Sequence, residues 1–413
     1  MEGEEVTIEA VGSGSRCGVP YTSVRVSSTT FDLPSYLTVT AIIGRGANGM
    51  VVSALDSRTS TRVAVKKLRG ALSGSARDNK RVLWEVRLLR GLQHENLMGL
   101  LDLLLPSEQC PHQCDIYLVM PLLESDLHRI ITSGQPLTDQ HVQFFVYQLL
   151  LALKYLHSAG VIHRDVKPSN VLLNSDCAIK LGDYGLSRPA AGEDMTEYVV
   201  TRWYRAPEVM LDSAHYGPSM DLWGLGCIMA ELLGRRALFP GKDYMDLLAL
   251  ICSTLGSPSE DSLGFISNGK AKEYLRRLPQ RQPVPLATLF PGANPAGLDL
   301  LQGLLQFNPA HRLTAVQALQ HPYLASLHSE DPVYEPVCAV PIDLTLGRLS
   351  SGGGGGGGEG GKGGRGGSSS QEAEEPQGEV LRQLLWEEAR RFRPELPPLP
   401  PPLERQQPAT ASH

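Results

Sequence analysis

The chain contains 413 residues, has a formal net charge of −6 and is 42% hydrophobic. A chain of this length exceeds what one hydrophobic core usually fills, so we expect two domains or one unit of two lobes. The charge excludes a global basic field for nucleic acid or anionic lipid, and the 7 scattered cysteines do not form the pattern of a secreted disulfide framework.

The amino-terminal region lacks the apolar run of a secretory signal, because it begins with the acidic stretch MEGEEVTIEA. Residues 1–30 are rich in Ser, Thr, Gly and charge without a sustained period, which predicts a flexible segment. The longest apolar run, residues 96–106, is too short to span a bilayer and contains Asp102. We therefore expect a protein of the cytoplasm and nucleus, with no direct membrane or nucleic-acid partner.

Residues 37–68 predict a small β-rich unit. Two β-branched runs are separated by a glycine-rich turn and then by DSRTST, as in successive antiparallel strands. Residues 79–92 follow, with Val82, Val86 and Leu89 at helical spacing. We expect this helix to pack on the sheet.

The chain from Asp139 onward is predicted to be mainly helical, because apolar residues recur at helical period over 141–160, 219–234 and 296–308. The glycine-rich tract 352–378 has almost no side chains to bury and predicts a disordered insert. After the tract, an amphipathic helix over residues 379–393 places four apolar side chains on one face: Leu381, Leu385, Ala389 and Phe392. The proline-rich residues 394–413 predict a disordered tail.

Three separated motifs suggest phosphate chemistry in the first half of the chain. GRGANGMV, residues 44–51, fits a tight hairpin or a dinucleotide fingerprint, but strands on both sides favour a flap that covers phosphates. Lys66 and Glu85, taken singly, are typical of solvated positions. Together with the flap, they predict an ion pair that orients Lys66 toward the α- and β-phosphates of a nucleotide.

HRDVKPSN and GDYG supply the remaining chemistry. Asp165 is expected to accept or orient the proton of an incoming hydroxyl, and Lys167 to neutralise the transferring phosphoryl group. Asn170 and Asp183 are expected to hold Mg²⁺. An isolated loop aspartate is usually a turn former or a helix cap, but the order of these motifs before APE, residues 206–208, favours phosphoryl transfer.

From Tyr36 to Tyr323 the chain resembles a eukaryotic protein kinase. The resemblance implies an α+β, bilobal protein kinase domain over residues 37–324, with an N-lobe over 37–120 and a C-lobe over 125–324. It implies ATP with two Mg²⁺ ions in the cleft, Met120 as gatekeeper and Asp126 at the ribose. The implied nucleotide-binding residues are Ile43, Gly44, Gly46, Gly49, Val51, Ala64, Lys66, Met120, Pro121, Leu123, Asp126 and Leu172.

TEYVVTRWYRAPE, DLWGLGCIMAELLGRRALFPG and FNPAHRLTAVQALQHPYL resemble the mitogen-activated protein kinases of the Thr-Glu-Tyr type. The helix at 379–393 resembles the extension that crosses back to the small lobe in that family. The resemblance implies a monomeric serine/threonine kinase that acts on sites followed by proline. It also implies activation by a dual-specificity MAP kinase kinase, reversal by phosphatases, and a tie between Glu208 and Arg312.

The Thr-Glu-Tyr triplet predicts a switch that depends on phosphorylation. Each phosphate adds roughly −1.5 to −2 charge and strong acceptor oxygens, which arginine side chains can hold. The alternative is a polar loop whose hydroxyls never meet a kinase. The expected partners are two pairs of arginines, one for each phosphate: Arg164 and Arg188 for Thr196, and Arg202 and Arg205 for Tyr198.

Several positions depart from the family pattern. Trp84 stands where an arginine commonly reaches the threonine phosphate, and Arg81, one turn earlier, is a possible substitute. Tyr184 replaces the phenylalanine of D-F-G, and Asn48 replaces an aromatic residue of the flap. None of these changes removes a catalytic group.

Residues 325–351 are expected to form a carboxy-terminal extension with an acidic docking turn. Its candidates for binding basic motifs of activators and substrates are Glu330, Asp331 and Glu335, and an ordinary solvated acidic turn is the alternative. CPHQC, residues 110–114, could suggest zinc, but no second pair of ligands lies nearby, so a loop is preferred.

Two other functions compete with this interpretation. A pseudokinase scaffold would bind partners without phosphoryl transfer, but Lys66, Glu85, Asp165, Asn170 and Asp183 are all intact. A cyclin-dependent kinase is disfavoured by the Thr-Glu-Tyr triplet and the late amphipathic helix. The sequence therefore predicts an active MAP kinase.

Overall fold

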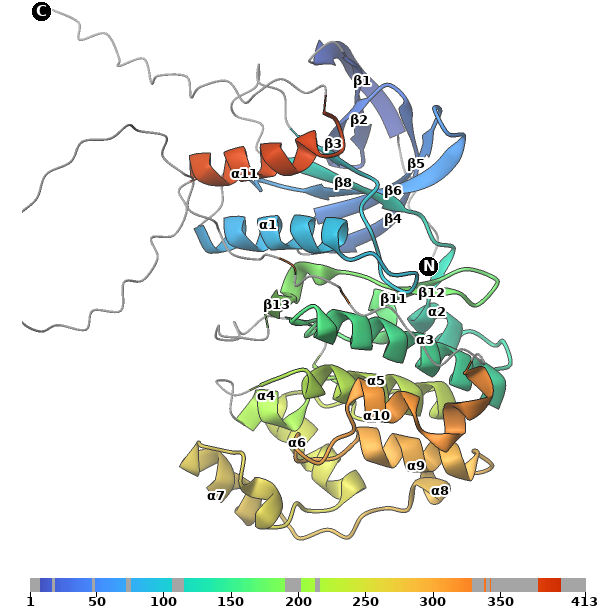
Figure 1. Cartoon of the computed structure of the whole chain (residues 1–413), viewed down its shortest axis with the longest axis vertical. Coiled ribbons are helices and arrows are strands. Elements are labelled where there is room, and N and C mark those ends of the chain that lie inside the picture. The colour runs from blue at the N-terminus through green and yellow to red at the C-terminus, as the bar shows by residue number, and fades with distance from the viewer. Residues whose placement is uncertain are drawn as a thin grey trace, which may run out of the picture.

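The structure is a computed structural model that describes residues 8–16, 19–46, 49–71, 76–105, 115–189, 202–211, 216–328, 338, 342 and 378–394. Two lobes are stacked along the longest axis of the molecule, a small one rich in strands and a larger one made mainly of helices (Figure 1). The bilobal kinase fold predicted from the sequence is confirmed.

The small lobe is built on a five-stranded sheet with the order β4-β5-β6-β8-β7. The strands are β4 (Leu37–Gly46), β5 (Gly49–Asp56), β6 (Thr61–Leu68), β7 (Asp102–Leu104) and β8 (Ile116–Pro121). Helix α1 (Ala76–Gly91) covers one face. Because neighbouring residues of a strand point to opposite faces, Lys66 and Lys67 of β6 are separated: Lys66 contacts Glu85 of α1, and Lys67 lies beside Asp115.

A second, three-stranded antiparallel sheet precedes the kinase domain, so the predicted flexible segment over residues 1–30 is wrong for most of that range. Its strands are β1 (Ile8–Arg16), β2 (Val19–Val26) and β3 (Thr29–Pro34). Val26, Phe31 and Leu33 are fully buried in the same cluster as Val65 and Tyr117 of the larger sheet. Burial of these apolar side chains stabilises the sheet. The sequence does not show a clear alternation of apolar residues there, because many Ser and Thr residues lie between them.

The large lobe is formed around α3 (Asp139–Ser158) and α5 (Ser219–Gly234), as predicted from helical spacing. Helix α3 begins with a capping box between Thr138 and His141 and buries one long apolar face. The other helices are α2 (Leu127–Thr132), α4 (Pro207–Leu211), α6 (Tyr244–Leu255), α7 (Gly269–Arg277), α8 (Leu286–Leu289), α9 (Pro295–Leu304) and α10 (Ala315–Leu319). Within the described ranges, none of the helices has both the length and the apolar character needed to cross a bilayer.

Short elements at the top of the large lobe carry the residues that face the small lobe. The strands are β9 (Ser125–Asp126), β10 (Val161–Ile162), β11 (Val171–Leu173), β12 (Ile179–Leu181) and β13 (Arg188–Pro189). The 3₁₀ turns are η1 (Pro168–Asn170) and η2 (Tyr184–Leu186), with η3 (Asp261–Leu263) and η4 (Pro322–Leu327) elsewhere in the lobe. These elements place the HRD and DYG motifs next to each other.

The predicted tie between Glu208 and Arg312 is confirmed as an ion pair whose two side chains are fully buried. Arg312 donates from Nη1 and Nη2 to the two carboxylate oxygens, at 2.6 and 3.0 Å. The same guanidinium also donates to the carbonyl oxygens of Ser219 and Gln306. The pair therefore links α4, α5 and the segment before α10.

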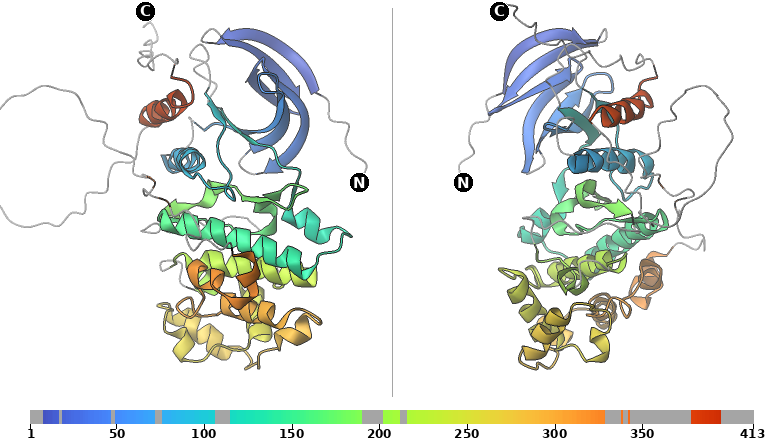
Figure 2. Two further views of the ribbon diagram at one scale, coloured as in Figure 1. Left: turned by 45° about the vertical axis from the view of Figure 1, so that its right-hand side comes forward. Right: turned by 90° about the vertical axis from the view of Figure 1, so that its left-hand side faces the viewer.

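Helix α11 (Gly378–Arg390) lies beside α1 in every view (Figure 2). The predicted apolar face is confirmed: Leu381, Leu385 and Ala389 are fully buried, and Phe392 packs against the same cluster. The extension thus crosses back to the small lobe, as the family resemblance implied.

Three ionic contacts hold α11 and the residues after it in place. Glu388, 3% exposed, accepts a hydrogen bond from Arg87 Nε at 3.2 Å and lies 2.6 Å from Arg90 Nε. Beyond the helix, Arg393 donates to Asp102 of β7 at 2.6 Å. The buried Glu388 carboxylate therefore joins α11 to α1, the helix that carries Glu85.

Replacing Glu388 by Ala should lower the free energy of unfolding by about 3 kcal/mol, since two arginines lose their buried counter-charge. The expected result is a lower thermal midpoint and faster hydrogen exchange in α1 and α11. Glu387→Ala is the control, because Glu387 is exposed on the same turn. Equal midpoints for the two variants would contradict a structural role for the Glu388 contacts.

Candidate active site

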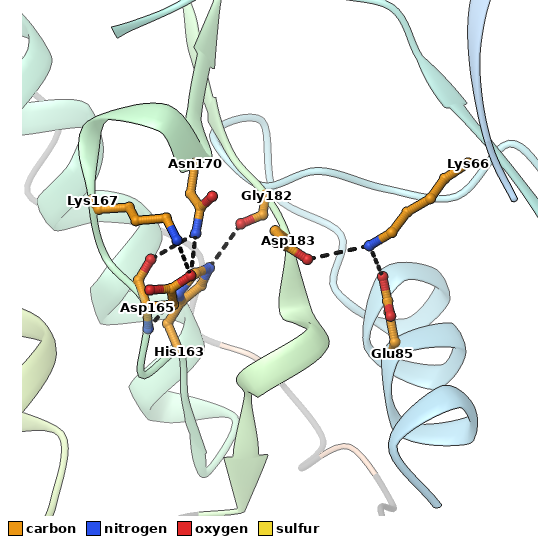
Figure 3. Close-up of polar contacts among 8 residues, drawn as sticks. All are labelled: Lys66, Glu85, His163, Asp165, Lys167, Asn170, Gly182 and Asp183. Carbon is orange, nitrogen blue, oxygen red and sulfur yellow. Dashed lines mark hydrogen bonds and ion pairs between the residues drawn. The ribbon is translucent and has the colours of Figure 1, made fainter. Parts of the chain in front are cut away.

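Lys66 of β6 extends from the small lobe, and its ammonium lies between the carboxylates of Glu85 and Asp183 (Figure 3). Its Nζ donates to Glu85 Oε1 at 2.7 Å and to Asp183 Oδ1 at 3.2 Å. Burial lowers the pKa of Lys66, but the charges of Glu85 and Asp183 outweigh burial and raise that pKa above its usual value. Lys66 in turn holds the pKa of Asp183 below its usual range. The predicted pairing of Lys66 with Glu85 is thus present.

The catalytic-loop candidates also meet. Asp165 Oδ2 accepts from Lys167 Nζ at 2.6 Å and from Asn170 Nδ2 at 2.9 Å. The Asn170 amide nitrogen also donates to the Asp165 carbonyl at 2.8 Å, which fixes the turn η1. Figure 3 shows this group facing the Lys66 group across the backbone at Gly182. Four segments of the chain therefore bring six predicted polar residues together.

A residue that sequence reasoning missed fixes the geometry of this loop. Asp221 of α5, 1% exposed, accepts from the backbone N–H groups of His163 at 2.9 Å and Arg164 at 2.8 Å. It also forms a 2.9 Å hydrogen bond with the ring of His157. Burial alone would raise the pKa of Asp221, but His157 and the backbone donors lower it. The only signal was its place in DLWGLG, whose partners lie far away in the sequence.

The DYG segment adopts a strained backbone at the metal-binding candidate. Asp183 has φ 61°, in the left-handed region that few residues other than glycine adopt. The hydroxyl of Tyr184 lies 3.2 Å from the Met98 carbonyl oxygen and 3.1 Å from that of Leu181. Burial raises the pKa of Tyr184, which keeps the hydroxyl protonated. The change from phenylalanine is therefore accommodated by a buried polar contact.

The implied nucleotide-binding residues line up along paired strands. In the register of the sheets, Gly44 and Lys66 both face Val51, Ala64 faces Met120, Gly46 faces Gly49, and Asp126 faces Leu172. Pro121 ends β8 and Leu123 follows it, while Ile43 lies where the pairing of β4 shifts and is 39% exposed. The tip of the flap, including Asn48, lies outside the described residues.

Two of these positions have a structural explanation that does not require a nucleotide. Gly49 has φ 138°, and a Cβ there would approach the Lys67 carbonyl oxygen to 1.9 Å, so only glycine fits. Asp126 caps helix α2 by accepting from the Arg129 N–H at 3.0 Å. Both features shape the flap and the start of the large lobe.

Arg164 and Arg188 are the arginines predicted to hold a phosphate on Thr196. Arg164 is stacked 4.8 Å from the Tyr216 ring, and burial together with the nearby charges of Arg81 and Arg205 lowers its pKa. Arg188 lies on β13 and is 7% exposed. The like charges of Arg81 and Arg205 beside Arg164 would favour an anion there.

Arg202 and Arg205 share one aromatic partner. Their guanidinium carbons lie 5.0 and 5.6 Å from the Tyr244 ring centroid, and Arg205 also donates to the Tyr244 hydroxyl. Thr196 and Tyr198, the predicted phosphorylation sites, lie outside the described residues. The same is true of the docking candidates Glu330, Asp331 and Glu335, and of CPHQC at 110–114.

Comparison with known proteins decides the family. Residues 37–324 match the family model described as a protein kinase domain. Mitogen-activated protein kinase 5 of Oryza sativa subsp. indica is 49% identical over 300 residues, which cover 72% of this chain and 80% of the relative. The chain belongs to the mitogen-activated protein kinase family.

Other MAP kinases are similarly related. Extracellular signal-regulated kinase 1 of Dictyostelium discoideum is 48% identical over 316 residues, 76% of this chain and 59% of the relative. Mitogen-activated protein kinase 3 of Arabidopsis thaliana is 47% identical over 326 residues, 78% of this chain and 87% of the relative. The prediction of a serine/threonine protein kinase of the extracellular-signal-regulated type is confirmed.

Asp221→Asn should slow phosphoryl transfer. An amide accepts through one oxygen only, so its NH2 group would face one of the N–H groups that Asp221 now holds, and the loop that carries Asp165 would shift. We expect kcat to fall about 100-fold, the effect of a displacement of roughly 1 Å at a catalytic group, with a KM for ATP close to that of the parent. Steady-state kinetics of the full chain measure both constants.

Asp176→Asn, an exposed change in the turn between β11 and β12, serves as the control. A kcat for Asp221→Asn equal to that of the control would show that the loop keeps its geometry without the carboxylate.

Proposed function

We propose that this MAP kinase uses ATP and Mg²⁺ to phosphorylate serine or threonine followed by proline, and that phosphorylation of Thr196 and Tyr198 activates it for intracellular signalling. The observation that carries the proposal is the meeting of Lys66, Glu85 and Asp183 with the Asp165 group (Figure 3). A scaffold that only binds partners does not require this geometry.

The residues at the site fit a nucleotide with bound metal. Among the described residues, no group of three or more His, Cys, Asp or Glu side chains forms a metal cage. Mg²⁺ at kinase sites needs few protein ligands, because water and phosphate oxygens complete its octahedron. Asn170 and Asp183 would hold it, and the bound ion would neutralise charge on the β- and γ-phosphates. Lys66 supplies a fixed cation for the α- and β-phosphates.

Asp165 and Lys167 are assigned to the transfer itself. Asp165 orients the substrate hydroxyl and receives its proton, while the hydroxyl oxygen forms a bond to the γ-phosphorus. The bond between that phosphorus and the bridging oxygen breaks, and its electron pair leaves with ADP. Lys167, 2.6 Å from Asp165, offsets negative charge on the phosphoryl group in transit.

The arginines support the proposed switch. Arg81 and Arg205 each repel Arg164, so a phosphate on Thr196 would relieve this repulsion as well as add hydrogen bonds. Arg188 is the further candidate for that phosphate, and the Arg202–Arg205 pair on Tyr244 is the candidate for the phosphate on Tyr198. Each bound phosphate would attach its own residue to these arginines.

The remaining parts of the proposal come from membership of the family. A dual-specificity MAP kinase kinase would add the phosphates and phosphatases would remove them. Basic docking motifs of partners would bind Glu330, Asp331 and Glu335. We propose that the kinase acts as a monomer in the cytoplasm and nucleus.

Dual phosphorylation should raise kcat/KM of the full chain toward a Ser-Pro peptide in Mg-ATP by at least about 10-fold. Thr196→Ala with Tyr198→Phe should remove this response to a MAP kinase kinase. Asp165→Asn should lower kcat by about 10²–10⁴-fold, the usual contribution of a general base.

A Ser-Gly peptide serves as the matched substrate control and should be phosphorylated poorly. If Asp165→Asn left kcat unchanged, the proposed transfer step would be refuted. If Thr196→Ala with Tyr198→Phe left the response to a MAP kinase kinase unchanged, the proposed switch would be refuted.

A further inference from the structure

Trp84 makes a contact that joins the two lobes. Its ring belongs to α1 of the small lobe and is 4% exposed. The guanidinium carbon of Arg188, on β13 of the large lobe, lies 4.8 Å from the ring centroid. A guanidinium within about 6 Å of an indole centroid is attracted to the negative face of the ring. Because both residues are buried, water screens this attraction little.

Each end of this contact is adjacent to the catalytic machinery. Glu85 follows Trp84 on α1 and forms the 2.7 Å ion pair with Lys66. Arg188 is paired with Ile162 of β10, and the next residue of that segment is His163 of the HRD motif. The contact therefore connects the helix that supports Lys66 with the strand that leads into the loop of Asp165.

We propose that Trp84 is a positioning residue for phosphoryl transfer. Its indole holds Arg188 and so keeps α1 against the catalytic loop whether or not Thr196 carries a phosphate. The proposal rests on the proposed function, since it concerns how phosphorylation controls the same site. It predicts a kinase with measurable activity before phosphorylation, which dual phosphorylation then raises.

Charge explains why an indole and an arginine act differently at position 84. An arginine there would repel Arg188. Only a phosphate bound by both arginines would offset that repulsion and join them. The indole attracts Arg188 in both states and has a single N–H with which to hold a phosphate. Trp84 therefore replaces a conditional connection between the lobes with a permanent one.

Lys80 provides a matched control on the same ring. Its Nζ lies 4.7 Å from the Trp84 centroid, so its geometry resembles that of Arg188. Lys80 and Trp84 are one turn apart on α1, and this contact joins no second element. Lys80→Met should therefore leave activity unchanged in both phosphorylation states.

The test compares full-length variants in two states, the Thr196→Ala/Tyr198→Phe background and the dually phosphorylated form. The readout is kcat/KM for a Ser-Pro peptide in Mg-ATP. In the first state, Trp84→Leu and Trp84→Arg should each lower kcat/KM about tenfold, and Trp84→Phe, which keeps a ring, about threefold. After phosphorylation all three should lie within about threefold of the parent, because the phosphate then bridges the arginines.

The deciding quantity is the ratio of activities between the two states. A general loss of folded protein lowers both states equally and leaves the ratio unchanged, whereas loss of a positioning contact raises it. If Trp84→Leu does not fold, the Phe and Arg variants decide. An unchanged ratio, or an undetectable activity of the parent in the Thr196→Ala/Tyr198→Phe background, would overturn the role of Trp84. Inactivity of the phosphorylated parent would instead overturn the proposed function on which it rests.

Discussion

The rest of this structure depends on the ionic contacts of the Lys66 ammonium with two carboxylates, one from each lobe. Glu85 on α1 lies 2.7 Å away and Asp183 of the DYG segment 3.2 Å away. If α1 moved outward, Lys66 would keep only one partner and would lose its fixed direction. Every feature that holds α1 in place therefore acts on the catalytic cation.

Buried acidic side chains provide much of that support. Asp221 holds the catalytic loop, Glu208 joins α4 to α5 through Arg312, and Glu388 joins α11 to α1. Each is at most 3% exposed. Removing one partner of a buried pair leaves an uncompensated charge, so these contacts fix a geometry as well as add stability. The Trp84–Arg188 contact joins the two lobes through a guanidinium and an aromatic ring, with no carboxylate.

The sequence predicted most of the site because the kinase motifs occur in a fixed order and carry their chemistry in the residue type. Lys66, Glu85, Asp165 and Asp183 are candidates from the sequence alone. In the structure Lys66 contacts Glu85 and Asp183, and the Asp165 group faces them (Figure 3). Helices α3, α5 and α11 were predicted from apolar spacing, which burial of one face requires.

The missed features depend on partners that are distant in the sequence. The sheet β1–β3 has too many Ser and Thr residues to show a clear alternation, and its order comes from burying Phe31 and Leu33 against the next sheet. The residues around Asp221 in the sequence do not indicate its three partners, which lie about 60 residues earlier in the chain. Trp84 was interpreted only as the absence of an arginine, because its stacking on Arg188 requires the fold.

The most direct test of the account is the effect of Glu85→Gln on kcat of the phosphorylated full chain. The substitution keeps the shape of the side chain and removes its charge, so Lys66 loses the partner that fixes it from α1. The account predicts that kcat falls by about tenfold or more while the thermal midpoint stays close to that of the parent. An unchanged kcat would show that phosphoryl transfer does not depend on the Lys66–Glu85 ion pair.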